Sequence, residues 1–190
     1  MDHTRMPMEE EVVLVDAHDV SIGTLGKLAA HQAGALHRAF SVFLFDTSGR
    51  LLMQQRARTK YHSGGLWTNT CCGHPRPQEP TLLAAQRRLM EEMGIDAMLE
   101  EQFSFVYKAS FDNGLHEHEF DHVYFGIWTG AVTPALSEVE DHCYMAMDEL
   151  STALRERPEH YSAWLVACWP RLIDAHLSWM KGIAHHRYHP

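Results

Sequence analysis

Carboxylates, arginines and a glycine recur at long, regular spacings in the middle of the chain. Five residues separate Gly73 from Glu79, and seven more lead to the run RRLMEEMGI at 87–95. Arg88 and Glu92 are four residues apart, so they share one face if the segment is helical. On an arbitrary helix such residues form a solvated ion pair. The alternative is that Glu92 binds a hard cation such as Mg²⁺ while Arg88 binds phosphate oxygens.

Two adjacent thiols, Cys71 and Cys72, directly precede this pattern. A cysteine is more often a small buried apolar residue than a nucleophile or base, and spacing alone does not choose between these two. Four cysteines among 190 residues are too few for a disulfide scaffold. Residues 1–11 are polar and acidic and lack the apolar core of a signal peptide. We therefore expect reduced thiols in a cytoplasmic protein.

A second candidate metal site combines imidazole and carboxylate side chains. Glu117 and Glu119 are two residues apart and face the same way if they lie on a strand. With His31, His37 and His74 they form a ligand set that suits Mn²⁺, Zn²⁺ or Fe²⁺. The chain has fifteen histidines, however, so any one of them is more often a surface or core residue than a ligand.

Three cations, Arg56, Arg58 and Lys60, alternate with Ala57 and Thr59. If a strand continues through them they project from one side, either as a phosphate-binding cluster or as a charged edge that discourages aggregation. The net charge of −9 argues against a general nucleic-acid binder, so an anionic ligand needs such a local basic cluster. No apolar run approaches the ~18–20 residues that a membrane span requires.

The hydrophobic pattern predicts the elements that position these residues. Gly, Pro, Thr, Asn and Cys are frequent at 58–78, which predicts an ordered functional loop. Pro80 and Gly94 mark the start and the end of a helix, and the chain after Pro134 is expected to be mostly helical. The pattern predicts strands at 12–15, 40–46, 51–55, 103–111 and 120–128, and helices at 23–33, 81–94, 147–155 and 163–180. We expect one α/β (α+β) domain with mixed sheets flanked by helices.

The spacing from Gly73 onward resembles the Nudix signature, G-x5-E-x7-R-E-U-x-E-E-x-G-U, in which U is aliphatic. It departs from that signature at one position, where Arg88 replaces the first Glu of the R-E pair. Most Nudix proteins cut diphosphates with carboxylate-bound Mg²⁺. The lost carboxylate and the adjacent cysteine suggest a diphosphate that is bound but not cut. The resemblance implies a compact Nudix-type domain across 1–190, with its core at about 36–155 and with an N-terminal strand and helix and a C-terminal helix added.

A closer resemblance, from about Asp16 to Trp164, is to the type I isopentenyl-diphosphate isomerases. Its most specific segments are LHRAFS at 36–41 and WTNTCCGHP at 67–75, together with the Nudix-like helix and the run EHE at 117–119. The resemblance implies interconversion of isopentenyl diphosphate and dimethylallyl diphosphate by metal-dependent addition and removal of protons. This reaction belongs to isoprenoid biosynthesis.

The same resemblance implies a role for each candidate residue. The catalytic residues are Cys72 and Glu119, with Tyr107 assisting the glutamate. Glu92 binds a Mg²⁺ ion that bridges to the substrate diphosphate, and Trp164 faces the reacting carbon skeleton. The ligands of a tightly held Mn²⁺ or Zn²⁺ are His31, His37, His74, Glu117 and Glu119. The diphosphate is bound by Lys27, Arg56, Lys60 and Arg88.

Two other functions compete with the isomerase. A Nudix diphosphate hydrolase shares the fold and Mg²⁺, but it leaves Cys72 without a role and favours Glu where Arg88 stands. A catalytically inactive Nudix domain would bind a ligand or a protein. For the isomerase we expect a small prenyl diphosphate as substrate, no nucleic-acid or membrane partner, and a monomer or weak homodimer.

Overall fold

The central strand β3, His37–Phe45, is buried along almost its whole length. In the computed structural model, which describes residues 10–60 and 62–188 (only the backbone for 184–188), this strand contacts several others. A strand buried on both faces must be covered on both faces. Its partners are β1 (Glu11–Val15), β4 (Leu51–Arg56), β6 (Cys71–Gly73) and β8 (His116–Ile127).

Among the described residues, nine strands form one mixed sheet. Strands β3 and β8 run parallel, with His37 opposite Glu119, and the other pairs are antiparallel. Strand β7 pairs with β8 and places Tyr107 opposite Glu119. The remaining strands are β2 (Ser21–Gly26), β5 (Trp67–Thr68), β7 (Glu100–Ser110) and β9 (Val139–Met145).

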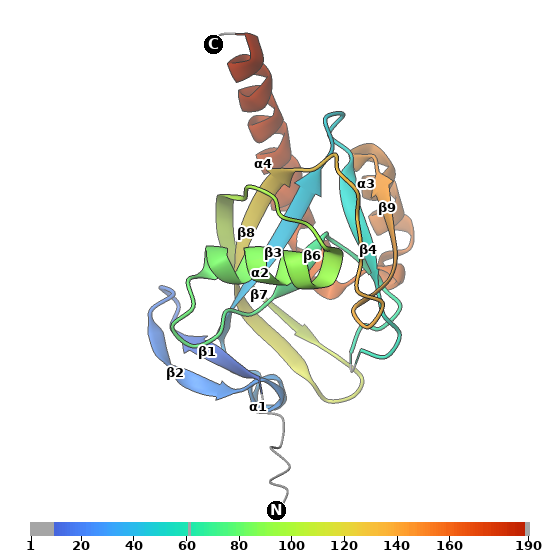
Figure 1. The fold of residues 1–190 in the computed structure, drawn as a ribbon. Coiled ribbons are helices and arrows are strands. Elements are labelled where there is room, and N and C mark those ends of the chain that lie inside the picture. Colours follow the sequence, from blue (N-terminus) through green and yellow to red (C-terminus); the bar gives the residue numbers. More distant parts are fainter. Residues whose placement is uncertain (1–9, 61, 189–190) are drawn as a thin grey trace, which may run out of the picture.

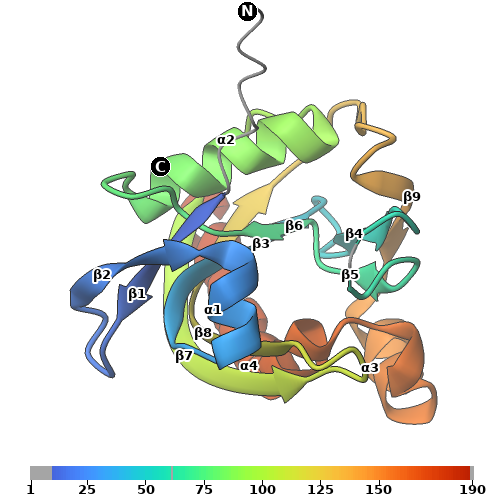
Figure 2. The ribbon, with the colours of Figure 1, turned by 90° about the horizontal axis from the view of Figure 1, so that it is seen from below.

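Helices cover both faces of the sheet, and Figures 1 and 2 show them on opposite sides of β3. On one face, Val42 and Leu44 pack with Leu89 and Met93 of helix α2. On the other face, Phe43 of β3 packs with residues of helices α3 and α4. The helices are α1 (Lys27–Ala33), α2 (Thr81–Met93), α3 (Met147–Glu156), the 3-10 helix η1 (Pro158–His160) and α4 (Ala163–Tyr188).

The predicted α/β fold class is confirmed, and most of the long elements lie where the pattern placed them. The strands expected at 12–15, 40–46 and 51–55 correspond to β1, β3 and β4, and the helix expected at 81–94 is α2. Helix α2 ends at Gly94, which has φ 65° and donates its backbone N–H to Met90 O, as a C-cap should. A Cβ at Gly94 would lie 2.7 Å from Thr133 O, so glycine is required there.

Two expectations were wrong, and in both cases strand pairing overrode the local pattern. The helix expected at 23–33 begins only at Lys27, because 21–26 form β2 on the edge of β1. The chain after Pro134 is mostly helical, as expected, but it also contains β9, which the pattern did not predict and which pairs with β4 through Leu52↔Tyr144 and Met53↔Cys143. The expected loop at 58–78 contains the short strands β5 and β6.

A partly buried ion pair attaches the segment before α2 to that helix. Arg87 donates from Nε to Glu79 Oε1 at 2.7 Å and from Nη2 to Glu79 Oε2 at 2.8 Å. Glu79 Oε2 also accepts the backbone N–H of Arg76 at 2.8 Å. The Glu79–Arg87 spacing of the signature therefore has a structural role here, because it anchors the segment that follows β6 and His74.

No helix formed by the residues that the structure describes is long and apolar enough to cross a membrane.

Glu79→Gln should lower the free energy of unfolding by about 1–2 kcal/mol at pH 7, because it removes a charged two-point hydrogen bond. Hydrogen bonding to Arg87 lowers the pKa of Glu79 below its usual 4.5. Its contribution is therefore present above pH 4.5 and is lost as the pH falls through the lowered pKa. Chemical denaturation of both proteins between pH 7 and pH 3 measures the difference, which should shrink with falling pH.

The matched control is Glu91→Gln, since Glu91 also contacts Arg87, at 3.3 Å, but is half exposed. An exposed i,i+4 pair contributes at most about 0.5 kcal/mol. Equal losses in the two variants, or a difference that does not depend on pH, would contradict the anchoring role of Glu79.

Candidate active site

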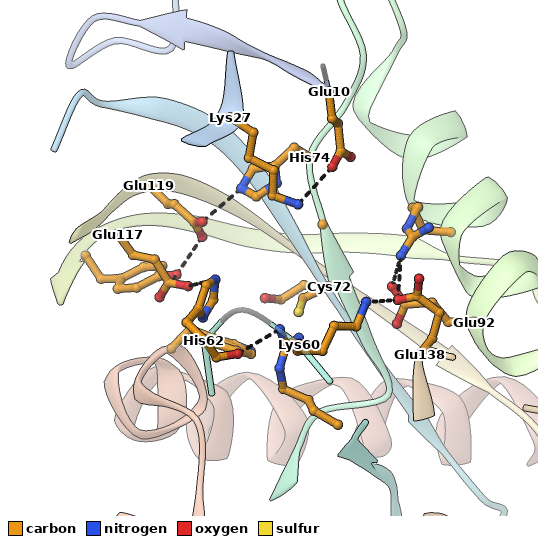
Figure 3. A pocket seen from close by; sticks show the side chains of 16 residues that line it. Glu10, Lys27, Lys60, His62, Cys72, His74, Glu92, Glu117, Glu119 and Glu138 are labelled. Carbon is orange, nitrogen blue, oxygen red and sulfur yellow. Dashed lines mark hydrogen bonds and ion pairs between the residues drawn. The ribbon is translucent and has the colours of Figure 1, made fainter. Parts of the chain in front are cut away.

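One cavity of about 260 Å³ brings together side chains from both ends of the chain. Its walls come from β3, β4, β6, β7, β8, α1, α2 and α4 and from the loops beside them. In Figure 3, Cys72 lies between a group that includes Glu117 and Glu119 and a second group that includes Lys60, Glu92 and Glu138. The lining residues are Glu10, Lys27, Ser41, Arg56, Lys60, His62, Cys72, Gly73, His74, Arg88, Glu92, Tyr107, Glu117, Glu119, Glu138 and Trp164.

The structure distinguishes the two adjacent cysteines. Because side chains alternate along a strand, Cys71 and Cys72 of β6 face opposite sides of the sheet. Cys71 is fully buried against helix α2, whereas Cys72 lines the cavity. Burial raises the pKa of the Cys72 thiol, so this group is protonated at neutral pH. Cys72 is therefore the thiol that a bound ligand can contact.

Four of the five expected metal ligands meet at one point. Atoms of His31, His37, His74 and Glu119 that could bind a metal all lie within 4.8 Å of one another, and all four residues are buried. They come from α1, the start of β3, the residue after β6, and β8. Glu117, the fifth, lies beside this group: its Oε2 is 3.1 Å from the Tyr107 hydroxyl oxygen, and its Oε1 is 3.6 Å from His62 Nε2.

The ring nitrogens of this group are suited to bind a cation. His37 Nδ1 is 2.8 Å from the carbonyl oxygen of Ala35, so it carries the proton and its Nε2 has a free lone pair. That Nε2 is 3.2 Å from His74 Nε2 and 3.5 Å from Glu119 Oε1. Burial lowers the pKa of His31 to about 4 and also lowers the pKa of His74, which keeps both rings neutral. Neutral imidazoles and an ionised carboxylate fit a divalent metal.

The two neighbouring glutamates of β8 differ in protonation. Burial raises the pKa of Glu119, but its contacts with the rings of His37 and His74 outweigh burial and hold that pKa well below the usual range. Burial and the charge of Glu119 raise the pKa of Glu117 well above its usual range. Tyr107 donates its hydroxyl to Glu119 Oε2 at 2.5 Å. Glu119 is thus an ionised carboxylate held by donors on both of its oxygens.

Several cations of the cavity are paired with carboxylates. Lys27 Nζ lies 3.0 Å from Glu10 Oε2, and Arg88 Nη2 lies 2.5 Å from Glu92 Oε1. The Arg88–Glu92 pair expected on one helix face is present, and it is a wall of the cavity instead of a solvated surface pair. Gln54 donates to the other oxygen of Glu92 at 3.0 Å, which fixes that carboxylate.

An aromatic wall closes the cavity near its centre. Trp164 is 4% exposed, and its indole N–H donates to Asn69 Oδ1 at 3.0 Å. The Arg56 guanidinium lies 5.1 Å from the centre of the Trp164 ring. His62 meets Trp164 edge to face at 6.3 Å and stacks on Phe111 at 5.1 Å. The wall offers an aromatic face beside a cation and a thiol.

All the residues that the resemblance implies for catalysis and diphosphate binding line this cavity. Arg58, the third cation of the expected basic cluster, does not. Strand β4 ends at Arg56, so the alternation expected for Arg56, Arg58 and Lys60 is interrupted. Arg58 turns outward to Glu140, at 3.0 Å, with 77% of its side chain exposed. Arg56 and Lys60 line the cavity, so the basic cluster expected here comprises two residues of the three.

Sequence reasoning missed four polar residues of the cavity: Glu10, Ser41, His62 and Glu138. His62 is one of fifteen histidines, and only its place in the predicted functional loop distinguished it. Glu138 precedes the strand β9 that the pattern did not predict. Ser41 lies opposite Cys72 in the β3–β6 pair, a relation that no linear spacing carries.

Comparison with known proteins identifies the family to which this fold belongs. Residues 35–165 match the NUDIX domain family. The chain is 55% identical to Isopentenyl-diphosphate Delta-isomerase 2 of Aromatoleum aromaticum, over 88% of this chain and 88% of that protein. It is 50% identical to Isopentenyl-diphosphate Delta-isomerase of Serratia proteamaculans, over 84% of this chain and 89% of that protein.

Solved structures share the fold at low identity. The structure of DR0079 from Deinococcus radiodurans superposes with a TM-score of 0.72 at 17% identity, covering 85% of this chain and 98% of that chain. A MutT protein from Methanosarcina mazei Go1 superposes with a TM-score of 0.60 at 14% identity, covering 73% and 94%. At such identities the likeness concerns the fold alone.

If the four-residue group binds a metal, His31→Gln should weaken that binding by at least about tenfold, because one ligand is lost. The measurement is the content of Mn²⁺ and Zn²⁺ after dialysis, together with calorimetric titration of each ion. The control is His116→Gln, since His116 lies on β8 next to Glu117 but bonds Ser110 at 2.9 Å on the other face. Equal metal content in both variants would contradict the assignment.

Proposed function

The chain belongs to the NUDIX domain family and, within it, to the isopentenyl-diphosphate Delta-isomerases, and we propose that it interconverts isopentenyl diphosphate and dimethylallyl diphosphate with Cys72 and Glu119 as the proton-transferring pair. The observation that carries this proposal is that a protonated thiol and an ionised carboxylate line the same cavity. A shift of a double bond needs one proton donor and one proton acceptor at the same substrate.

The double bond moves by the addition of one proton and the loss of another. A proton is added to C4 of the alkene, the C3–C4 π electrons form the new C–H bond, and positive charge develops at C3. Loss of a proton from C2 returns two electrons to form the C2–C3 double bond. One of Cys72 and Glu119 supplies the first proton and the other accepts the second, and the two exchange roles in the reverse reaction. No phosphorus bond breaks.

Glu119 is oriented by Tyr107 and by the histidine group. The Tyr107 hydroxyl bonds Oε2, and His74 Nε2 lies 2.9 Å from Oε1, so the carboxylate is held on both oxygens. We propose that His31, His37, His74, Glu117 and Glu119 hold Mn²⁺ or Zn²⁺. When bound, such an ion supplies positive charge that stabilises the ionised form of Glu119. Tyr107 assists by donating to the oxygen that faces away from the histidines.

The proposed diphosphate site lies on the opposite side of Cys72. Lys27, Arg56, Lys60 and Arg88 provide positive charge from four separate segments of the chain, and Glu92 would hold a Mg²⁺ ion shared with the diphosphate. Binding at this end positions the carbon skeleton without taking part in the proton transfers. The five-carbon chain then extends past Cys72 toward Glu119.

Trp164 would stabilise the charge that develops at C3. An aromatic face in a desolvated site attracts a cation by about 2 kcal/mol. Trp164 is held by its bond to Asn69, so its ring does not have to reorganise during the reaction. The nearby Arg56 lies over the same ring, and we propose that it turns to the diphosphate when substrate binds.

The alternative, a diphosphate hydrolase, is less well supported. Arg88 stands where the Nudix signature has a carboxylate, and its guanidinium contacts Glu91, Glu92 and Glu138. That position thus contributes positive charge for phosphate binding and no metal ligand. A hydrolase also gives no function to Cys72 or to the buried group around Glu119.

Cys72→Ala and Glu119→Gln should each lower kcat for isomerisation by at least about 10³-fold, because each removes a proton-transferring group. The measurement is phosphorus and proton NMR of metal-loaded protein with isopentenyl diphosphate and Mg²⁺. It follows dimethylallyl diphosphate and free phosphate separately.

Cys71→Ala is the matched control for the thiol, since Cys71 faces helix α2, and it should retain activity. Phosphate release by the wild type without isomerisation would favour the hydrolase. Full isomerase activity in Cys72→Ala would exclude Cys72 from the reaction.

A further inference from the structure

Glu138 is a carboxylate that lines the cavity but takes no part in the proposed proton transfers. It lies just before β9 and is positioned by its backbone: its carbonyl oxygen accepts the N–H of Ala57 at 2.9 Å, and its own N–H donates to Ala135 at 2.8 Å. Ala135 in turn donates to the carbonyl oxygen of Glu92 at 2.9 Å. Glu138 is therefore attached through the main chain to the end of β4 on one side and to α2 on the other.

The side chain of Glu138 joins two cations of the proposed diphosphate site. Its Oε2 accepts a close hydrogen bond from Lys60 Nζ and lies 3.2 Å from Arg88 Nη2. Figure 3 shows Lys60 extending to Glu138, with a dashed line marking the pair. Burial raises the pKa of Glu138, but Lys60 and Arg88 outweigh it and lower that pKa, so the carboxylate is ionised. In the ligand-free protein one oxygen of Glu138 thus contacts both cations.

Glu92 and Glu138 flank the same nitrogen of Arg88. Arg88 Nη2 is 2.5 Å from Glu92 Oε1 and 3.2 Å from Glu138 Oε2. Glu92 accepts a hydrogen bond from Gln54 and is 5% exposed. The side chain of Glu138 is 24% exposed. Glu138 is thus the more adjustable of two carboxylates that converge on one guanidinium. If Arg88 turns toward a phosphate, the two carboxylates are left facing each other.

The charge of the site makes this arrangement unfavourable for a diphosphate alone. Four cations (Lys27, Arg56, Lys60, Arg88) and three carboxylates (Glu10, Glu92, Glu138) leave one net positive charge. A diphosphate ester carries about three negative charges at neutral pH, since the second ionisation of a terminal phosphate has a pKa near 6. One bound Mg²⁺ brings the total to about zero, whereas without it about two negative charges are uncompensated.

Resting on the diphosphate site proposed above, we propose that Glu138 makes diphosphate binding conditional on Mg²⁺. It forms ion pairs with Lys60 and Arg88 while the cavity is free of ligand. Once those cations turn to the diphosphate, Glu138 lies next to phosphate oxygens and needs a divalent cation as its counter-ion, together with Glu92. The residue therefore selects for a diphosphate that arrives with Mg²⁺ and disfavours the uncomplexed anion.

The test is calorimetric titration of inorganic pyrophosphate into the purified full-length protein, with Mg²⁺ and with no added Mg²⁺. The quantity that matters is the ratio of the two dissociation constants. In Glu138→Gln, binding without Mg²⁺ should become tighter by about tenfold, because a nearby like charge is removed, and the ratio should fall accordingly. Glu138→Asp keeps the charge and should keep the wild-type ratio.

The matched control is Glu140→Gln. Glu140 lies two residues away and pairs with the exposed Arg58 outside the cavity, so its removal changes net charge equally and should leave the ratio unchanged. The backbone bonds that position residue 138 do not involve its side chain, so Glu138→Gln is expected to fold, and thermal unfolding checks this.

An unchanged ratio in Glu138→Gln, or an equal loss of affinity in both conditions, would overturn the inference while leaving the diphosphate site intact. If the wild type binds no pyrophosphate with Mg²⁺, the diphosphate site itself fails and the inference fails with it. The first outcome concerns Glu138 alone, so the two failures are distinguishable.

Discussion

The parallel register of β3 and β8 is the constraint on which the site depends. It places His37 opposite Glu119, and the antiparallel pairing of β7 and β8 places Tyr107 opposite the same glutamate. Side chains alternate along a strand, so a slip of one residue would send Glu117 and Glu119 to the face covered by α2. The core opposes such a slip, because it would move Phe125 of β8 out of the core beneath α4 and place charged side chains against the apolar residues beside α2. The site is thus held in register by the hydrophobic core.

Buried charge is tolerated in this cavity because most of its ionised groups have a charged partner, while Arg56 lies over the Trp164 ring. Glu119 is bonded by Tyr107 and faces His37 and His74, while the cations on the other side face Glu10, Glu92 and Glu138. An unpaired charge in such a setting costs several kcal/mol, which would exceed the margin of stability of a typical domain if repeated. A ligand that enters the cavity therefore has to replace these pairs with others of equal strength.

The cavity is divided into two chemically different ends, and Cys72 lies between them (Figure 3). One end has neutral imidazoles and one ionised carboxylate, which suit a metal and a proton acceptor. The other end has guanidinium and ammonium groups interleaved with carboxylates, which suit a phosphate and a hard cation. Because the two ends differ, a charged part of a substrate can be bound electrostatically at one end while another part reacts near the aromatic wall, away from water.

The sequence alone indicated the fold class, the helix that carries the signature, and nearly every candidate residue. These could be predicted because the signature spacing and the specific short segments can be read along the chain without knowledge of its folding. Spacing alone could not choose between Cys71 and Cys72, and the choice of Cys72 came from the family resemblance. The face of β6 on which each residue lies decides which thiol lines the cavity. Sequence reasoning misjudged Arg58 because the end of β4 depends on pairing with β9 and β5, not on the alternation itself. Glu138 was missed for the same reason: its role comes from Lys60 and Arg88, which are 78 and 50 residues away, and contacts over such separations exist only once the sheet has formed.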